Sequence, residues 1–570
     1  MRPARSRLPL FAVSVILLTT LATAGTEAVL NPAKTWIAVL FVGLLAVGYF
    51  GLALSASTIA FGMLPRTRAT PRRAAATATP RTALLLPIYD ERPEQIARAV
   101  RVMADSLDTL DGITIHILSD TQNPAIAARE ARTWPPTATT RTGIEVNYRR
   151  RNQNIGRKAG NLMAFCRGEG HAYDFAIVLD ADSLMTGDAI RALIAELRDD
   201  PHAALVQSVP YPVGAETLFG RMQQFAVRLG TPLAVAGLHL WQQRRGSYWG
   251  HNAILRLSAF TEHADLPILR GAAPLGGEIL CHDTIEAALL LRAGWAVRMA
   301  PDIHGSYETT PSNILDHLVR EQRWCQGNLQ HLRLVGAPGL LPESRFHIGQ
   351  GILYYLSTPL GLMLSALLLA GVASFGADGH QAAPSDTLVR LMLWTVVALL
   401  FGPRIVSLIR GLIVPGVAAR FGGRLPLIAS AVAEQIAATL LAPVQAVSIT
   451  GFVIATFAGK IVTWDAAERG DRAIGLHEAW RLLRWHTAIG ICITAGIAAT
   501  QPAALPWTAP FLVGLIVSIP VAMASSSVWL GRFAGRLGLF LTEDELFPTP
   551  ELAALTAREN DGVARIPAMG

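Results

Sequence analysis

Cysteine is scarce in this chain of 570 residues, which has four cysteines and no C-x-x-C. Their spacing indicates neither a disulfide framework nor a structural zinc site, and a reducing compartment fits. Lysine is scarcer still, since the only lysines are Lys34, Lys158 and Lys460. Arginine therefore carries nearly all of the positive charge.

Three signatures of other protein classes are missing. The chain lacks G-x-x-x-x-G-K-[ST], which argues against an ATPase-coupled exporter. It shows no internal repeat of the inverted kind that is common in transporters. Aromatic and basic residues do not alternate as they do in RNA-binding modules, so a net charge of +7 does not indicate a nucleic-acid partner.

Charge is sparse in two parts of the chain, where long apolar runs stand instead. Runs over 8–24 and 35–64 reach or approach the ~20 residues that cross a bilayer. Arginines flank this pair, which places both of its ends in the cytoplasm. A cleaved signal peptide remains open for the first run, because Ala22-Thr23-Ala24 resembles a cleavage site.

Further apolar runs follow at 348–376, 388–411, 425–458, 486–500 and 508–530. The long 425–458 run contains Pro443 and is interpreted as two crossings, or as one crossing with an interfacial helix. With the first pair, this predicts eight spans and keeps each arginine cluster on the cytoplasmic side.

The predicted organisation has five parts. Two transmembrane helices occupy 1–64, a basic linker 65–83 and a cytoplasmic soluble domain 84–345. About six transmembrane helices occupy 346–530, with a cytoplasmic loop over 460–485, and a cytoplasmic tail covers 531–570. The fold class is therefore a membrane α-helical bundle plus a cytoplasmic α/β domain.

The soluble domain alternates strands with helices. Short buried strands are predicted at 83–86, 113–118 and 175–179, with helical spacing between and after them. This alternation predicts a mostly parallel sheet. Ligands bind at the carboxyl ends of such strands, and all three of these strands end in acidic residues.

Asp180 and Asp182 stand directly after the third strand. Carboxylates at this spacing can share a divalent cation with a diphosphate. Two aspartates in a surface turn are the alternative, but Asp120 at the end of another strand favours the cation site.

The basic segment with Lys158 and Asn161 lies just before the third strand and can hold phosphates or orient a donor; an ordinary solvated loop is the alternative. Asp283, after His282, enters a predicted helix and can act as a general base or serve only as a helix cap. His282 is given a structural role.

Arg320 and Arg323 are one helical turn apart and can face one pyrophosphate, and Trp324 offers a flat surface for a sugar ring. The alternative is a juxtamembrane arginine cluster with an interfacial tryptophan.

Together and in this order, these elements resemble the family 2 glycosyltransferases, especially processive membrane synthases such as cellulose synthase. The family's motifs match Pro87-Ile88-Tyr89-Asp90-Glu91, Asp120, Asp180 with Asp182, Cys281-His282-Asp283 and Arg320-x-x-Arg323-Trp324. His282 replaces a glutamate of the usual T-E-D, and Arg320 replaces the glutamine of Q-x-x-R-W. These departures and longer strings, such as residues 179–187, 248–253 and 323–329, resemble one branch, the glucans biosynthesis glucosyltransferase H proteins.

The resemblance implies a glycosyltransferase A-type fold, UDP-glucose as donor, and inverting transfer that builds a β-1,2-linked periplasmic glucan. It implies that Asp283 is the base, that Asp182 holds Mg²⁺ or Mn²⁺ and that Asp120 contacts uridine. The substrate-binding residues that it implies are Pro87, Tyr89, Glu91, Asp120, Lys158, Asn161, Asp180, Arg320, Arg323 and Trp324.

The resemblance also implies a multi-pass protein of the bacterial inner membrane and several partners: the growing glucan, membrane lipid, acyl carrier protein and a periplasmic glucan-processing protein. Another β-1,4 or β-1,3 glucan synthase and a lipid-linked sugar transferase remain alternatives. A transporter with a non-catalytic domain is the alternative from another class, supported by Glu434 and Gln435 in an apolar run.

Overall fold

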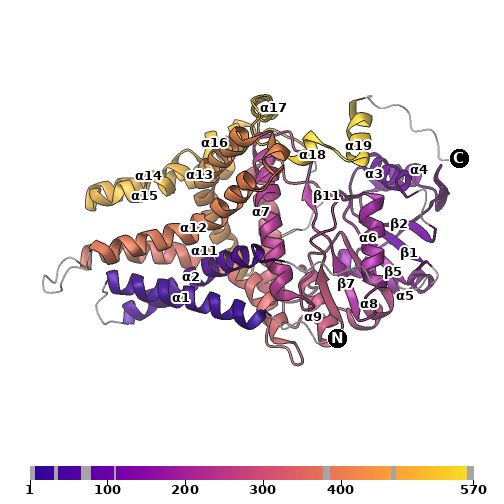
Figure 1. Cartoon of the computed structure of the whole chain (residues 1–570), viewed down its shortest axis with the longest axis horizontal. Coiled ribbons are helices and arrows are strands. Elements are labelled where there is room, and N and C mark those ends of the chain that lie inside the picture. Colours follow the sequence, from indigo (N-terminus) through magenta and orange to yellow (C-terminus); the bar gives the residue numbers. More distant parts are fainter. Residues whose placement is uncertain are drawn as a thin grey trace.

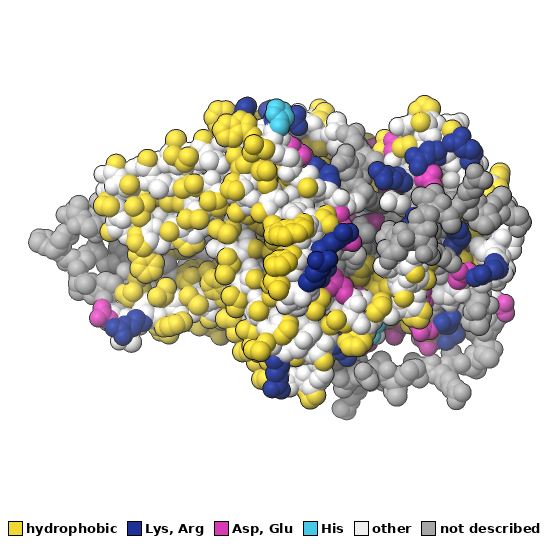
Figure 2. All heavy atoms as spheres, turned by 90° about the horizontal axis from the view of Figure 1, so that it is seen from above, with side chains coloured by type: hydrophobic (Ala, Val, Ile, Leu, Met, Phe, Trp, Pro, Cys, Tyr) yellow, Lys and Arg dark blue, Asp and Glu magenta, His cyan; other side chains and the backbone are white. Residues whose placement is uncertain are grey.

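The computed structural model describes residues 7–30, 36–65, 79–107, 111–375, 386–463 and 470–560. Most of the predicted linker over 65–83 lies outside the described residues, as do Lys34 and part of the loop over 460–485. Long helices extend to one side of the molecule and a sheet with its own helices lies on the other (Figure 1). In Figure 2, hydrophobic side chains cover the long helices, and most charged side chains lie over the part that contains the sheet.

Six helices in the described part of the chain are long and apolar enough to cross a membrane. They are α1 (Leu8–Leu30), α2 (Trp36–Gly62), α11 (Pro342–Phe375), α12 (Asp386–Ile413), α13 (Arg424–Phe457) and α14 (Leu476–Thr500). A bent pair, α15 (Leu505–Ile516) and α16 (Ser518–Ser525), raises the number to seven if it forms one span. This is fewer than the eight predicted, because the segment over 425–458 forms one continuous helix despite Pro443.

Helix α13 contacts the soluble side of the molecule near both of its ends. At its start, Ser430 accepts a hydrogen bond from the backbone N–H of Phe540 (2.9 Å). Just beyond its end, the backbone N–H of Val462 donates to the side chain of Gln326 (2.8 Å). With 34 residues, α13 is about 51 Å long, well beyond the thickness of a bilayer core. These contacts hold both ends of α13 against segments that lead to the soluble domain.

The soluble domain is built on an eight-stranded sheet with the order β10-β7-β9-β5-β1-β2-β4-β3. Its strands are β1 (Thr82–Ile88), β2 (Ile113–Ser119), β3 (Thr137–Thr139), β4 (Glu145–Arg150), β5 (Phe175–Val178), β7 (Ala203–Gln207), β9 (Ala253–Arg256) and β10 (Ala296–Met299). Strands β5, β1, β2 and β4 run parallel, whereas β9 runs antiparallel between β5 and β7. The predicted, mostly parallel α/β sheet is confirmed.

A small second sheet, in the order β6-β11-β8, lies beside the strand ends. It consists of β6 (Leu184–Met185), β8 (Tyr211–Pro212) and β11 (Ser306–Glu308). Its central strand pairs Tyr307 with Leu184 and with Tyr211.

Helices cover both faces of the large sheet because side chains alternate along its strands. Leu84 and Leu86 of β1 pack with α3 (Pro93–Asp105) and α6 (Gly187–Arg198). Ala83 and Leu85 face the other way and pack with α5 (Arg157–Arg167), α8 (Leu257–His263) and α9 (Asp283–Arg292). Helix α4 (Pro124–Thr133) follows β2 and packs on α3.

Two helices join the sheet to the bundle. Helix α7 (Leu218–Gln242) lies between them in Figure 1 and packs on α2, so closely that a Cβ at Gly237 would overlap the carbonyl oxygen of Thr58. Helix α10 (Ile314–Gln330) buries Cys325 and Leu329 against α11 and α13.

The last described residues form α17 (Val528–Arg536), α18 (Glu543–Leu546) and α19 (Pro550–Asn560). The segment predicted as a tail over 531–570 is therefore helical and packed over much of its length, since Ala534, Phe540 and Leu552 are buried.

Candidate active site

Asp180 and Asp182 lie just past the end of β5, as the sequence predicted. Lys158, in the first turn of α5, bonds the carboxylate of Asp180 and also donates to the carbonyl oxygen of Gly250 (2.8 Å). The hydroxyl of Thr309 donates to Asp182 Oδ2 (2.6 Å). The structure thus brings three distant parts of the chain to the strand end.

Glu308 and His251 also belong to this site, and sequence reasoning missed both. His251 Nε2 lies 3.3 Å from Glu308 Oε2 and 3.9 Å from Asp180 Oδ2. Burial, together with the charges of Asp182 and Asp180, raises the pKa of Glu308 to about 8. The side chains that meet here come from β11 and from the turn before β9, and 127 positions separate Thr309 from Asp182. No local spacing in the sequence indicates such a meeting.

Asp120 directly follows β2 and is nearly fully buried. Burial raises the pKa of its carboxyl group, although Arg151 forms a two-pronged ion pair with it (2.7 and 2.8 Å). Asn161, predicted to bind substrate, has no exposed side-chain surface. It donates to the carbonyl oxygen of Leu118 (3.0 Å) and accepts from Arg149 (2.7 Å). Asn161 therefore supports the end of β2, and its contact with substrate stays a prediction.

Pro87, Tyr89 and Glu91 lie at the end of β1 and in the turn that follows, next to the end of β2. Between them, Asp90 has a φ of 58° and accepts hydrogen bonds from the backbone N–H groups of Gln122 and Asn123 (3.1 and 2.9 Å). This segment therefore joins the ends of two neighbouring strands, whereas contact of Pro87, Tyr89 and Glu91 with a ligand stays a prediction.

Asp283 is the first residue of α9, and His282 occupies the capping position. The carboxylate of Asp283 is thus not the helix cap that the sequence left open. Gly250 approaches it closely, since a Cβ there would lie 3.4 Å from Asp283 Oδ2. The charges of Asp180, Lys158, Asp182 and Asp283 all act on buried His251, which places Asp283 and the strand-end carboxylates in one site.

His282 pairs with a buried carboxylate. Its Nδ1 lies 3.0 Å from Glu286 Oε1, one turn further along α9. Burial lowers the pKa of His282, but the charge and the hydrogen bond of Glu286, together with the charge of Asp283, outweigh burial and raise the pKa. His282 is therefore tied to the helix, in line with its predicted structural role.

Arg320, Arg323 and Trp324 share helix α10. The guanidinium of Arg320 stacks over the Trp324 ring, 4.7 Å from its centroid, and its charge acts on Glu308. The Trp324 side chain is 42% exposed, so part of its ring is open to a ligand. Contact of both arginines with a pyrophosphate stays a prediction.

The end of α10 holds the loop that leads to Asp283. The side chain of Gln330 accepts from the backbone N–H of Leu280 (3.0 Å) and donates to the carbonyl oxygen of Glu278 (3.1 Å). His331, which is fully buried, bonds the carbonyl oxygen of Cys281 (2.8 Å). The helix that carries Trp324 therefore also positions the segment that carries the candidate base.

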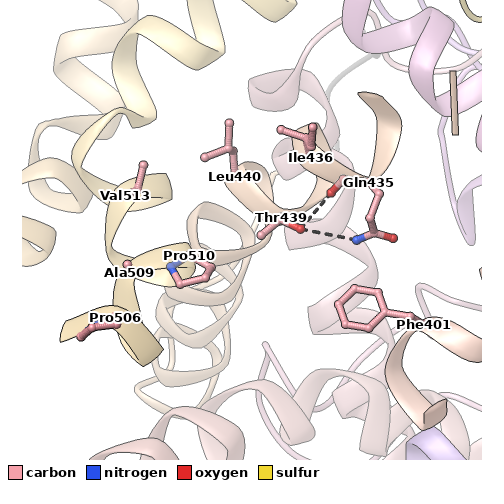
Figure 3. Close-up of a pocket in the computed structure, with 9 residues that line it drawn as sticks. All are labelled: Phe401, Gln435, Ile436, Thr439, Leu440, Pro506, Ala509, Pro510 and Val513. Carbon is pink, nitrogen blue, oxygen red and sulfur yellow. Dashed lines mark hydrogen bonds between the residues drawn. The ribbon is translucent and has the colours of Figure 1, made fainter. Parts of the chain in front are cut away.

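A cavity of about 530 Å³ lies elsewhere, among α12, α13 and α15 (Figure 3). Apolar side chains such as Phe401, Leu440 and Pro510 line most of it, and Thr439 bonds the backbone carbonyl of Gln435 (2.8 Å). None of its lining residues is ionisable, and it belongs to the membrane helices rather than to the candidate active site.

Strand-end carboxylates on an α/β sheet, a nearby carboxylate at a helix start and an exposed tryptophan beside membrane helices are the features of a membrane-embedded sugar-transferring enzyme. Two family models match the chain: "Glycosyl transferase family 2" over residues 84–263 and "Glycosyl transferase family group 2" over residues 175–443. The chain is 37% identical to "Glucans biosynthesis glucosyltransferase H" of Vibrio cholerae, over 90% of this chain and 74% of that protein. It is 38% identical to the protein of the same name from Shewanella oneidensis, over 90% and 73% of the two chains.

The chain belongs to the family 2 glycosyltransferases and, within them, to the glucans biosynthesis glucosyltransferase H family. Among solved structures, it is similar to a mannosyltransferase from Pyrobaculum calidifontis in complex with GDP-Man and Mn²⁺. That match has 17% identity and a TM-score of 0.40, and covers 66% of this chain and 98% of the other.

Proposed function

We propose that this chain is an inverting glucosyltransferase that uses UDP-glucose to elongate a β-1,2-linked glucan and passes the product across the bacterial inner membrane. The observation that carries the proposal is the meeting of Asp283 with the strand-end pair Asp180 and Asp182 around Gly250 and His251. Family membership supports the activity and the donor class, and the candidate spans support a multi-pass protein with its catalytic domain in the cytoplasm.

The donor diphosphate would lie against Asp180, Lys158 and Asp182. The ammonium of Lys158 is held in place by Asp180 and by the carbonyl oxygen of Gly250, which leaves its third proton for a phosphate oxygen. Asp120 and its partner Arg151 would flank the uridine at the neighbouring strand end. Arg323 would support the departing diphosphate, whose charge grows as the bond to the sugar breaks.

A divalent cation fits these donors. After burial, the charges of Asp182 and Asp180 raise the pKa of Glu308, so negative charge gathers here that a cation would neutralise. Among the described residues, no three histidine, cysteine or acidic side chains are already spaced to hold a metal. Asp182 would therefore hold Mg²⁺ or Mn²⁺ together with diphosphate oxygens. When bound, the ion supplies charge stabilisation of the leaving UDP.

Asp283 would act as the general base. It removes the proton from an acceptor hydroxyl while that oxygen bonds C1 of the glucose and the bond from C1 to the UDP oxygen breaks. One displacement inverts C1 and needs no carboxylate nucleophile.

Trp324 would carry the acceptor sugar. Its helix packs directly on α11 and α13 through Cys325 and Leu329, so the acceptor platform adjoins the membrane helices. This proximity supports transfer coupled to export. The growing glucan and membrane lipid follow as partners, whereas acyl carrier protein and a periplasmic glucan-processing protein rest on the resemblance alone.

The test is UDP release by the purified full chain in detergent, with Mg²⁺ or Mn²⁺ and a panel of UDP-sugars, followed by linkage analysis of the product. Release with UDP-glucose and a β-1,2-linked product are expected. A β-1,4 or β-1,3 product would identify a different glucan synthase with the same site. No turnover of any UDP-sugar, even with lipid and acyl carrier protein present, would contradict the enzymatic function and favour the transporter alternative.

A further inference from the structure

The chain after the last candidate span returns to the soluble domain. Residues 538–560, here called the C-terminal strap, contain α18 and α19 and lead from the bundle to the sheet (Figure 1). Leu552 of α19 is buried in the same core as Leu184 of β6 and Tyr307 of β11. The side chains of Asp544 and Thr549 also hydrogen-bond Tyr307, so the strap touches the small sheet beside the candidate donor site.

Three consecutive acidic residues of the strap pair with arginines. Arg221 of α7 bonds Glu545 (2.9 Å), and Arg228 of α7 bonds both Asp544 (3.0 Å) and Glu543 (3.3 Å). Glu543 also pairs with Arg420, which precedes α13 (3.1 Å). Asp544 and the two α7 arginines are largely buried, so these ion pairs are shielded from solvent and strongly directional.

The same arginine reaches the small sheet. The Arg228 guanidinium lies over the ring of Tyr211 in β8, 4.0 Å from its centroid, and Tyr211 is the register partner of Tyr307 in β11. Burial and then the charge of Asp544 raise the pKa of Tyr307 to about 12, which shows that Asp544 also lies close to β11. The strap thus contacts β11 through Asp544, and it reaches β8 through Arg228 of α7.

Strand β11 connects the strap to the donor site. It pairs with β6 two residues after Asp182, and the hydroxyl of Thr309, just beyond β11, bonds Asp182 Oδ2 (2.6 Å). At the start of α6, the backbone N–H of Gly187 donates to Glu551 of α19 (3.4 Å). The turn that contains Asp182 is therefore held from both sides by elements that the strap contacts.

We propose that the C-terminal strap positions the donor site: through Asp544, Arg228 and the β8–β11 pair, it keeps Asp182 in the place where it holds the cation and the diphosphate. The inference rests on the proposed function, because Asp182 is a metal ligand only there. Asp544 and Arg228 are positioning residues that act through β11, and they touch neither sugar.

The test compares Asp544→Asn and Glu545→Gln with Glu216→Gln in the full chain in detergent. Glu216, just before α7, pairs with Arg532 of α17 (2.7 Å) and serves as an acidic control whose arginine partner lies outside α7. Calorimetry measures UDP binding at rising Mn²⁺ concentrations, and the melting temperature reports folding. Asp544→Asn is expected to raise the half-saturating Mn²⁺ concentration about tenfold, with Asp544→Glu restoring part of it and Glu216→Gln unchanged.

A lower melting temperature with unchanged Mn²⁺ dependence would overturn the proposal and leave the strap as a stabilising element only. An equal shift in Glu216→Gln would overturn it too. If Asp544→Asn does not fold, the same measurements on Arg228→Lys decide between these results, because Arg228 joins Asp544 to Tyr211. Asp182→Ala tests the proposed function separately from the role of the strap. If Asp182→Ala leaves the Mn²⁺ dependence of UDP binding unchanged, the metal-binding role of Asp182 is overturned.

Discussion

Gly250 faces the carboxylate of Asp283: a methyl group on Gly250 would rest 3.4 Å from Asp283 Oδ2, in van der Waals contact. The missing side chain at residue 250 therefore leaves space beside this carboxylate. A hydroxyl that gives its proton to Asp283 needs that space.

Gly250→Ala is expected to lower UDP release at least tenfold, because the methyl group fills the room beside the base and the φ of 91° disfavours alanine. Gly143→Ala is the matched control. Gly143 also has a positive φ, 84°, but a Cβ there would meet no atom within 4 Å. Equal loss of activity in both variants would show that backbone strain, and not the space beside Asp283, is responsible.

Trp324→Ala is expected to uncouple donor turnover from glucan synthesis. Without the ring under the acceptor, glucan formation should fall about tenfold, the effect of ~1.4 kcal/mol, while water still accepts part of the glucose. UDP release and incorporation of labelled glucose into glucan, measured together, check this. Trp480→Ala on α14 is the control, since Trp480 is exposed on a candidate span. A parallel fall of both readouts would place Trp324 at the donor instead.

The pair of His282 and Glu286 predicts a pH-dependent stability. The pKa of His282 is raised above its usual value of ~6.5, so the ion pair contributes its full stability below that pH and loses it as pH rises through the raised pKa. Asp283 favours the same charged form and Lys158 opposes it. The melting temperature in detergent should fall as pH rises through this window. Glu286→Gln and His282→Gln should both flatten this dependence, and a slope retained in either variant would contradict the prediction.

Helix α13 predicts a specific membrane topology. Because both of its ends contact elements of the soluble side, single cysteines at Arg420→Cys and Lys460→Cys should resist a membrane-impermeant maleimide in intact cells and react once the inner membrane is opened. Ala503→Cys, exposed between α14 and α15, should react in intact cells. The exposed Cys492 is replaced first. Reaction of only one of the two α13 positions would show that α13 crosses the membrane.

The sequence predicted the features that depend on local pattern. Strand β5 is a short buried run with Asp180 and Asp182 behind it, and the start of a helix at Asp283 is visible from its neighbours. Both predictions held in the structure because an apolar period and a strand-end carboxylate are local properties.

Features made by long-range contact escaped prediction. Glu308 and His251 reach the donor site only because β11 and β9 return to it, and Asp544 reaches β11 from the other end of the chain. The prediction of two crossings, or of one crossing with an interfacial helix, over 425–458 rested on Pro443. The helix continues through that proline and packs against α15, where Gly514 lies against its backbone. Tertiary packing decides which distant residues meet and whether a helix continues through a proline. The spacing of residues along the sequence does not predict that packing.

Single-turnover UDP release by Asp283→Asn is the most direct measurement of the central claim. The variant should bind UDP-glucose as the wild type does while UDP release falls by about 10²–10⁴, the usual effect of removing a general base. Asp265→Asn, which alters an exposed ion pair with Arg167, should leave release unchanged. Release by Asp283→Asn at the wild-type rate would contradict the assignment of Asp283 as the base and, with it, the proposed mechanism.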